Sequence, residues 1–317
     1  MKITFLGTAS GEGYPSPWCD CVNCQKAREL GGRNIRSRSA LMVNDDLLID
    51  AGPDIAASAA RFRIALNSVQ ALLLTHSHDD HLDAGTLRLR HTMASATPLP
   101  ALTIYGSSPS LSVAKTATRN NNDEDWLRVK YRALTAFDLT VIDTGFSSDK
   151  DPRYSLKFSA VHATTHRRYR LWPLRAHHMR PEDQAFIYIL KQVGATGSRD
   201  SSGPTILYAI DTGPFLDDTW AELESLANSG MQFDAVIMDA TMGTGHPEGL
   251  HMNGRQAAAH MSQLETLGLV TDGTLTLAHH FSHYYSPPHH QLRRQFSKLG
   301  LQPTYDGLRL EIRRGCL

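Results

Sequence analysis

The segment HSHDDH at residues 76–81 follows directly on the apolar run ALLLT at residues 71–75. A short apolar run of this kind is typical of a buried strand, so the histidines and acids are expected at the carboxyl end of that strand. Three imidazoles and a carboxylate within six residues are ligand types that divalent transition metals bind. The segment therefore predicts a metal site rather than a polar loop that is merely rich in histidine.

Strand patterns and helix patterns alternate along the chain. Short β-type runs recur, for example at Ile3–Leu6 and Ile206–Ile210. Helices are expected over Pro53–Phe62, Phe215–Leu226 and Asn253–Leu267, where proline suits the first turn of one and asparagine can cap another. This alternation predicts an α/β protein with layers of mixed strands.

The composition is that of an ordinary globular chain. Of 317 residues 41% are hydrophobic, and Lys plus Arg equals Asp plus Glu at 32 each. A chain without net charge has no global field that attracts nucleic acid or an anionic membrane, so neither is an expected partner. The opening MKITFLG lacks the pattern of a signal peptide, and no apolar run approaches the roughly 18 residues of a membrane span. We expect a cytoplasmic enzyme, with a homodimer as the default assembly.

Three of the four cysteines, Cys19, Cys21 and Cys24, lie within six positions of one another, whereas Cys316 stands alone. Cysteines this close in a cytosolic protein indicate a metal site more than a disulfide framework. Three thiolates need a fourth ligand to complete a tetrahedral zinc site, and no neighbouring residue provides it. The alternative is a group of three reduced, buried cysteines.

The HxHxDH pattern after a strand resembles the signature of the metallo-β-lactamase superfamily. This resemblance covers nearly the whole chain and implies a four-layer αββα sandwich with two mixed β-sheets, formed as one domain by residues 1–317. Residues 107–152 are then an inserted or elaborated segment. The cysteine cluster is similar to that of the PhnP-type cyclic phosphodiesterases, which close it with a histidine three residues beyond the last catalytic ligand. That position is His283 here.

The same resemblance indicates where the remaining ligands lie. The mid-chain ligand is His177 or His178, and both strand alternation and the family's Pro-Leu-x-Ala-x run favour His178. The strand-end Asp-Thr-Gly identifies Asp211, for which the alternative is an aspartate that caps the following helix. His280 takes the place of the last histidine ligand.

These assignments give three implied metal sites. The residues implied for the first catalytic metal are His76, His78 and His178, those for the second are Asp80, His81 and His280, and Asp211 bridges the two. Two such ions, manganese or zinc, can generate a hydroxide that attacks a phosphoryl group. The residues implied for a structural zinc are Cys19, Cys21, Cys24 and His283.

Asp80 and His251 are the predicted catalytic residues. The family has a non-ligand histidine near the position of His251 that can protonate a leaving oxygen, with His246 as the competitor and an exposed loop histidine as the alternative. The expected activity is hydrolysis of a small phosphate diester, best a cyclic ribose phosphate. The alternatives are a tRNA 3′-processing endonuclease and a non-hydrolytic protein resembling pyrroloquinoline-quinone biosynthesis protein B.

Overall fold

A computed structural model describes residues 1–90, 99–118, 129–144, 167–180, 184–193, 203–245 and 249–315. These described residues form two β-sheets of seven strands each. The first sheet contains β1 (Lys2–Gly7), β2 (Ala40–Val43), β3 (Leu47–Ile49), β4 (Ala71–Leu73), β5 (Leu102–Gly106), β6 (Val129–Ala133) and β14 (Arg309–Glu311). The second sheet contains β7 (Thr140–Thr144), β8 (Arg167–Arg175), β9 (Phe186–Val193), β10 (Thr205–Ala209), β11 (Ala235–Asp239), β12 (Leu275–His279) and β13 (Gln302–Pro303).

Both sheets are mixed. The order of the first is β14-β1-β2-β3-β4-β5-β6, antiparallel from β14 to β3 and parallel from β3 to β6. The order of the second is β13-β12-β11-β10-β9-β8-β7, antiparallel from β7 to β10 and parallel from β10 to β13. Parallel neighbours such as β10, β11 and β12 bring the loops at their carboxyl ends to one edge of the sheet, where ligand sites of α/β proteins form.

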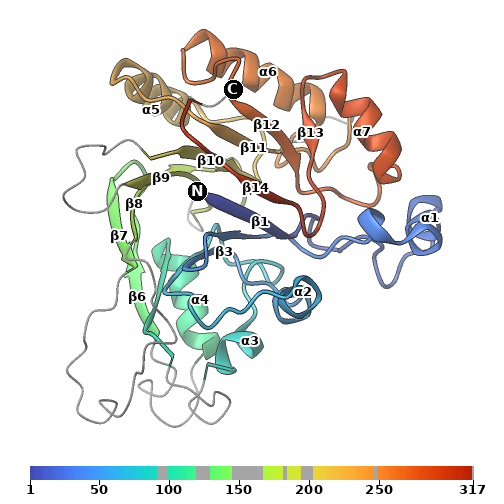
Figure 1. Cartoon of the computed structure of the whole chain (residues 1–317), viewed down its shortest axis with the longest axis horizontal. Helices are drawn as coiled ribbons and strands as arrows, with labels where there is room; N and C mark the ends of the chain where they lie inside the picture. Colours follow the sequence, from blue (N-terminus) through green and yellow to red (C-terminus); the bar gives the residue numbers. More distant parts are fainter. Residues whose placement is uncertain are drawn as a thin grey trace.

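Helices lie on the outer faces of the two sheets (Figure 1). The helical segments are α1 (Val22–Leu30), η1 (Gly32–Asn34), α2 (Ile55–Phe62), α3 (Ala84–Arg88), α4 (Ser108–Thr118), α5 (Asp217–Asn228), α6 (Gly254–Thr266) and α7 (His289–Ser297). Helices α2 to α4 share a core with the first sheet, and α5 to α7 share a core with the second. A third core, with Phe5 and Tyr208 among its members, joins the two sheets. The predicted αββα sandwich is confirmed.

Local sequence explains where α6, the helix that follows β11, begins. Asn253 accepts hydrogen bonds from the backbone N–H groups of Arg255 and Gln256, and the Gln256 side chain accepts one from the Asn253 N–H. This capping box fixes the start of α6 within one residue of the predicted position. It also fixes the chain direction just after His251.

The segment predicted as an insertion, residues 107–152, contributes to both sheets where it is described. It forms α4, β6 and β7, and the two strands lie at corresponding edges of the first and second sheets. Residues 119–128 and 145–152 of this segment, together with His246 and Cys316, lie outside the described residues. Within the described ranges, no helix has the length and apolar character of a membrane span.

Candidate metal centre

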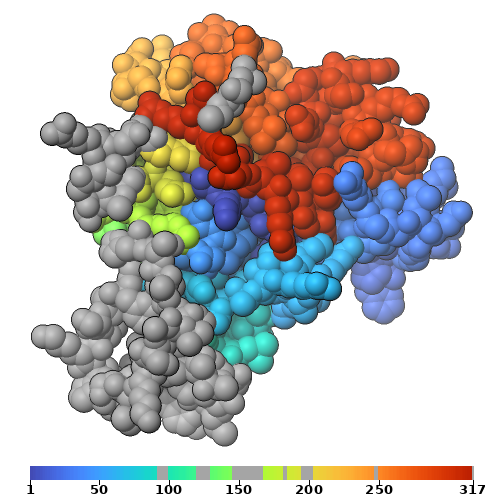
Figure 2. All heavy atoms as spheres, viewed as in Figure 1, coloured from blue at the N-terminus to red at the C-terminus, as the bar shows by residue number. Residues whose placement is uncertain are grey.

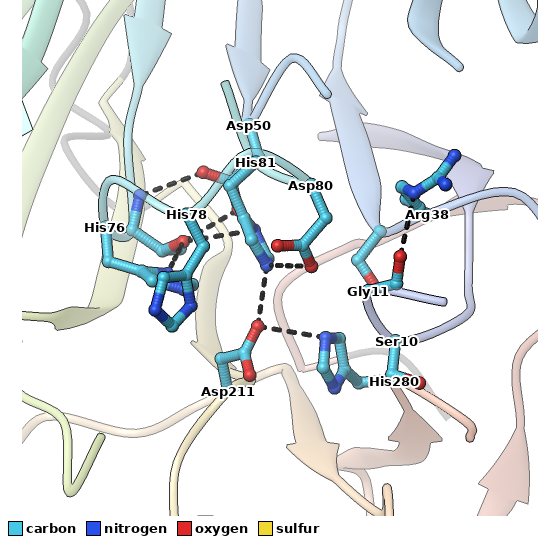
Figure 3. A network of polar contacts seen from close by, with 12 residues as sticks. Ser10, Gly11, Arg38, Asp50, His76, His78, Asp80, His81, Asp211 and His280 are labelled. Atoms are coloured by element: carbon cyan, nitrogen blue, oxygen red, sulfur yellow. Dashed lines mark hydrogen bonds and ion pairs between the residues drawn. The ribbon is translucent and has the colours of Figure 1, made fainter. Parts of the chain in front are cut away.

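The HSHDDH segment forms the loop that leaves β4, and its side chains converge at the edge of the first sheet (Figure 3). His76 and His81 are buried, Asp80 is half-buried and His78 is exposed. The Gly11 backbone lies beside Asp80, and a Cβ atom at this glycine would come within 3.2 Å of the Asp80 carboxylate. The loop after β1 therefore forms a close wall next to the acid.

His76, His78 and His178 form the first cluster of potential ligands. His76 Nε2 lies 2.8 Å from His78 Nδ1, and the His178 ring packs edge-on against both rings at centroid distances of 4.9 and 5.3 Å. The neighbouring His177 turns away and places its Nδ1 3.1 Å from the Pro214 carbonyl. Of the two histidines, the structure brings His178 into the cluster.

Asp80, His81, Asp211 and His280 form the second cluster. Asp211 Oδ2 lies 2.6 Å from His81 Nε2 and 2.9 Å from His280 Nε2, as the dashed lines in Figure 3 indicate. Its other oxygen, Oδ1, lies 3.6 Å from His178 Nε2 in the first cluster. One carboxylate therefore faces both clusters, the arrangement expected of a bridging ligand.

Asp211 and His280 adopt left-handed backbone conformations, with φ values of 51° and 66°. Such conformations are uncommon for residues other than glycine and concentrate at functional sites. His280 directly follows β12, and Asp211 lies two residues after the end of β10, so each backbone turn directs a side chain toward the centre instead of continuing the strand.

Each histidine of the two clusters, His78 excepted, has its Nδ1 atom engaged outside the centre. His81 Nδ1 lies 2.8 Å from Asp50 Oδ2, His280 Nδ1 lies 2.8 Å from Thr241 Oγ1, and His178 Nδ1 lies 3.2 Å from the Leu250 carbonyl. His76 Nδ1 contacts Thr75 Oγ1 at 3.0 Å. Such contacts fix the tautomer and orientation of a metal-bound imidazole, leaving Nε2 for the ion.

The buried Nε2 atoms of His81, His178 and His280 have no hydrogen-bond partner, although Asp211 oxygens lie within ion-pair distance of all three. Buried polar atoms of proteins are rarely left unpaired unless an ion or water completes them. Imidazole and carboxylate donors suit zinc and manganese. The residues present therefore fit two divalent ions.

The electrostatics of the site also favour cations. Burial and the positive charge of His81 lower the pKa of His76 well below its usual value. Burial opposes ionisation of Asp211, but the charges of His280 and His81 hold its pKa well below the usual range. The charges of Asp50, Asp80 and Asp211 outweigh burial and raise the pKa of His81 well above its usual value. His81 therefore holds a proton among the carboxylates of Asp50, Asp80 and Asp211. A bound metal ion would take the place of this proton and neutralise the negative charge of the carboxylates.

His251 lies beside the centre and lines the same pocket. Its Nδ1 is 3.4 Å from Asp239 Oδ2 and 3.5 Å from Asp211 Oδ1. Burial lowers its pKa, but the hydrogen bond and charge of Asp239, with Asp211, outweigh burial and raise the pKa to about 9. His251 therefore lies at the edge of the centre, and together with Asp211, Asp239 and His280 it forms a further group whose donor atoms could hold a metal ion.

Cys19, Cys21, Cys24 and His283 form a separate cluster at the start of α1. Cys21 is the N-cap of α1, and its Sγ lies 3.6 Å from His283 Nδ1. Burial raises the pKa of Cys21, but the Cys24 N–H and the His283 side chain outweigh it and lower the pKa to about 6. A thiolate at a helix N-terminus beside two further thiols and an imidazole fits structural zinc.

The sequence analysis missed the residues that orient the ligands. Asp50 is fully buried and contacts His81, while Asp239 contacts His251 and accepts hydrogen bonds from the N–H groups of Thr241 and Met252. Both acids directly follow or end apolar strands, in LLID and VIMD. The position of an aspartate at the end of an apolar strand, which identified Asp211, also indicates Asp50 and Asp239.

An αββα sandwich with two clusters of potential metal ligands that share one carboxylate is the arrangement expected of the metallo-β-lactamase superfamily. The model of the beta-lactamase superfamily domain matches residues 46–281, and the chain belongs to this family.

Curated relatives match only part of their length. Coenzyme PQQ synthesis protein B of Pseudomonas entomophila (strain L48) is 34% identical over 102 residues, which cover 28% of this chain and 33% of that protein. Its counterpart from Azotobacter vinelandii is 35% identical over 102 residues, with the same coverage. The match thus spans about a third of the length of these relatives.

Solved structures match nearly the whole chain. A new diphosphatase from the PhnP family has a TM-score of 0.65 at 20% identity, covering 98% of this chain and 96% of that chain. Zinc-bound PqqB from Methylobacterium extorquens has a TM-score of 0.64 at 18% identity, covering 98% and 100%. The short form of human tRNase Z has a TM-score of 0.57 at 16% identity, covering 98% and 99%. At these identities the three likenesses show a shared fold.

Proposed function

We propose that the protein is a metal-dependent phosphodiesterase that hydrolyses a small phosphate diester, with a cyclic ribose phosphate as the substrate class. The observation that carries this proposal is the position of Asp211, whose two oxygens face two separate groups of histidine ligands. A shared carboxylate is typical of two-metal hydrolytic sites. Most proteins of this superfamily are hydrolases, which agrees with the proposal.

The two clusters defined above would hold the ions, with Asp211 between them. Two divalent ions supply Lewis acidity, a water of lowered pKa and neutralisation of phosphoryl charge. The chain itself contributes orientation, because Asp50 and Thr241 fix the rings of His81 and His280. Fixed ligand rings keep the site ordered before the substrate arrives.

His251 is the proposed proton donor to the leaving oxygen. Asp239 and Asp211 hold its Nδ1 side, so the opposite ring nitrogen is available to a ligand in the pocket. When a cyclic diester is hydrolysed, the leaving oxygen stays attached to the sugar. The protonated leaving group therefore does not have to diffuse out past His251. General acid catalysis of this kind contributes about 10²–10⁴-fold to the rate.

The size and lining of the pocket favour a small substrate. Its volume is about 660 Å³, within the range of small-molecule sites. Glu12 and the aromatic rings of Tyr284 and Tyr285 line the wall around the candidate metal centre. A carboxylate suits sugar hydroxyls, whereas an aromatic ring suits the apolar face of a ribose or a base.

Two other functions have support of their own. The partial match to coenzyme PQQ synthesis protein B favours a role without diester turnover. The fold likeness to tRNase Z favours cleavage of an RNA chain, but equal numbers of acidic and basic residues provide little general attraction for RNA. The three functions differ in the substrate of the metal-loaded protein: a small diester, an RNA chain, or no diester at all.

The test is a substrate panel with the protein loaded with Mn²⁺ or Zn²⁺. We expect hydrolysis of bis(p-nitrophenyl) phosphate and faster hydrolysis of 5-phosphoribosyl 1,2-cyclic phosphate, each compared with a nucleoside diphosphate and a 3′-extended tRNA precursor. His251→Gln should lower kcat about 10²-fold or more, whereas His177→Gln, a nearby histidine outside both clusters, should keep it. Preferred cleavage of the tRNA, or a fully loaded protein that hydrolyses no diester, would overturn the proposal.

A further inference from the structure

A second pocket, of about 680 Å³, lies at the edge of the sandwich. Strands β13 and β14, which end the second and first sheets, both contribute to it, and α7 and the η1 segment complete it. Figure 2 shows the blue N-terminal segment against the orange-red α7 region on this side of the molecule. The pocket shares no lining residue with the pocket of the candidate metal centre.

The charged residues that line this pocket are all basic. Arg33 comes from η1, while Arg293 and Arg294 come from α7. No carboxylate lines the pocket, and none of the three arginines forms an ion pair with another described residue. The contrast with Arg38, which lies 3.0 Å from Asp54, indicates that these guanidinium groups are available to an external anion.

The floor of the same pocket is apolar. Leu277 from β12 is buried, and Leu308 and Leu310 from the β14 region are partly buried. The Tyr305 ring also lines the pocket and contacts the Arg33 guanidinium group. A ligand that fills the pocket therefore needs both an anionic group and an apolar or ring-shaped body.

Contacts between η1 and α7 hold the basic rim in place. The Arg33 guanidinium carbon lies 4.1 Å from the Tyr305 ring centroid, and Asn34 Oδ1 accepts a hydrogen bond of 2.8 Å from the His289 N–H. Arg36 Nη2 lies 3.1 Å from His289 Nδ1. A stacked arginine loses less freedom when it binds a phosphate, so the site is partly organised in advance.

The local field is already positive. Burial, and then the charges of Arg36, Arg33 and Arg293, lower the pKa of His289 to about 4. The pocket-lining face of α7 begins at the helix N-terminus, where the Asn34 side chain accepts a hydrogen bond from the His289 N–H. The positive charge of the pocket therefore comes from its arginines.

We infer that this pocket binds an organic phosphate, with the phosphate group on Arg33, Arg293 and Arg294 and the apolar body against the partly exposed Tyr305 and Leu308. Guanidinium forks match phosphate oxygens in pairs, and the pocket volume admits a ligand the size of a nucleoside monophosphate. The inference is independent of the proposed function, because it uses none of the residues of the metal centre.

The test uses AMP, inorganic phosphate and adenosine as probes of the metal-loaded protein, with binding measured by isothermal titration calorimetry in 50 mM and 200 mM salt. AMP contains no phosphodiester bond, so it is not a substrate of the proposed activity. We expect AMP to bind more tightly than either inorganic phosphate or adenosine, and its affinity to fall as salt rises.

Two double variants locate the binding. Arg33→Gln/Arg293→Gln should weaken AMP binding at least 10-fold, whereas Arg61→Gln/Arg255→Gln removes the same charge from exposed positions outside the pocket and should leave it unchanged. AMP should also raise the pKa of His289 in a pH titration followed by NMR. Unchanged AMP affinity in the first variant, equal affinity for AMP and inorganic phosphate, or an unmoved His289 titration would overturn the inference.

Discussion

The Asp50→Asn substitution tests whether the buried carboxylate behind His81 prepares the metal centre. Asp50 Oδ2 lies 2.8 Å from His81 Nδ1 and 2.9 Å from Thr75 Oγ1, and Oδ1 accepts a 2.9 Å hydrogen bond from the Thr75 N–H. In the variant the amide oxygen of Asn can still accept the hydrogen bond from the Thr75 N–H. The amide NH₂ group then faces His81 Nδ1. A donor there forces the His81 proton onto Nε2, the atom that faces Asp211.

The expected magnitude follows from the loss of that orienting contact. Changes to the outer partners of metal-bound histidines lower metal affinity about 10- to 100-fold, equivalent to about 1.4–2.8 kcal/mol. Because only one of the two clusters contains His81, we expect one ion to bind more weakly and the other to change little.

The assay is a titration of the metal-free centre with Mn²⁺ or Zn²⁺ against a competing chelator, with the cysteine site already filled. Asp46→Asn is the matched control, since Asp46 is a buried carboxylate at the other end of β3 and accepts hydrogen bonds from Tyr169 and Thr144. Equal affinity of the Asp50→Asn, Asp46→Asn and unchanged proteins for both ions would refute the reasoning.

Four further predictions test other parts of the structure. Asp211→Ala should reduce diesterase turnover by more than the ~100-fold typical of outer-partner changes, because both clusters lose their shared ligand; residual turnover near the normal level would contradict the two-metal assignment. His178→Gln should lose one catalytic metal by mass spectrometry, while His177→Gln should keep both. Cys21→Ala should lose one zinc and lower Tm by about 5 °C or more, since each lost kcal/mol costs a domain of this size roughly 2–4 °C; an unchanged zinc count would exclude the thiolate site. His289 has a folded pKa of about 4, below its unfolded value, so its contribution to stability is lost as pH falls from about 6.5 to 4. Denaturant unfolding at pH 7.5 and 5 should therefore show about 1–2 kcal/mol less acid destabilisation in His289→Gln than in the unchanged protein, and equal losses would contradict this origin.

Local patterns in the sequence were sufficient to predict the layers of the fold. The helix from Gly254 was predicted because Asn253 provides its cap within the same few residues. By contrast, α1 was not predicted, because its cap is the Cys21 thiol and its first turn is part of the cysteine cluster. A helix that begins on a potential zinc ligand lacks the usual sequence signals for a start.

Candidate ligands could be predicted where several of them share one loop. The HSHDDH segment carries its spacing within six residues, so no knowledge of long-range contacts was required. Asp50 and Thr241 could not be identified in this way, because each contacts a histidine 31 or 39 positions away in sequence. Their pairing depends on the order of strands in the sheets, which periodicity does not reveal.

The most direct test of the central claim is the metal content of the purified protein by mass spectrometry, measured together with hydrolysis of bis(p-nitrophenyl) phosphate after addition of Mn²⁺ or Zn²⁺. We predict about three ions per chain, one in the thiolate cluster and two at the histidine–aspartate centre, with diester hydrolysis that depends on the latter two. A single thiolate-bound zinc and no hydrolysis after metal addition would contradict the account.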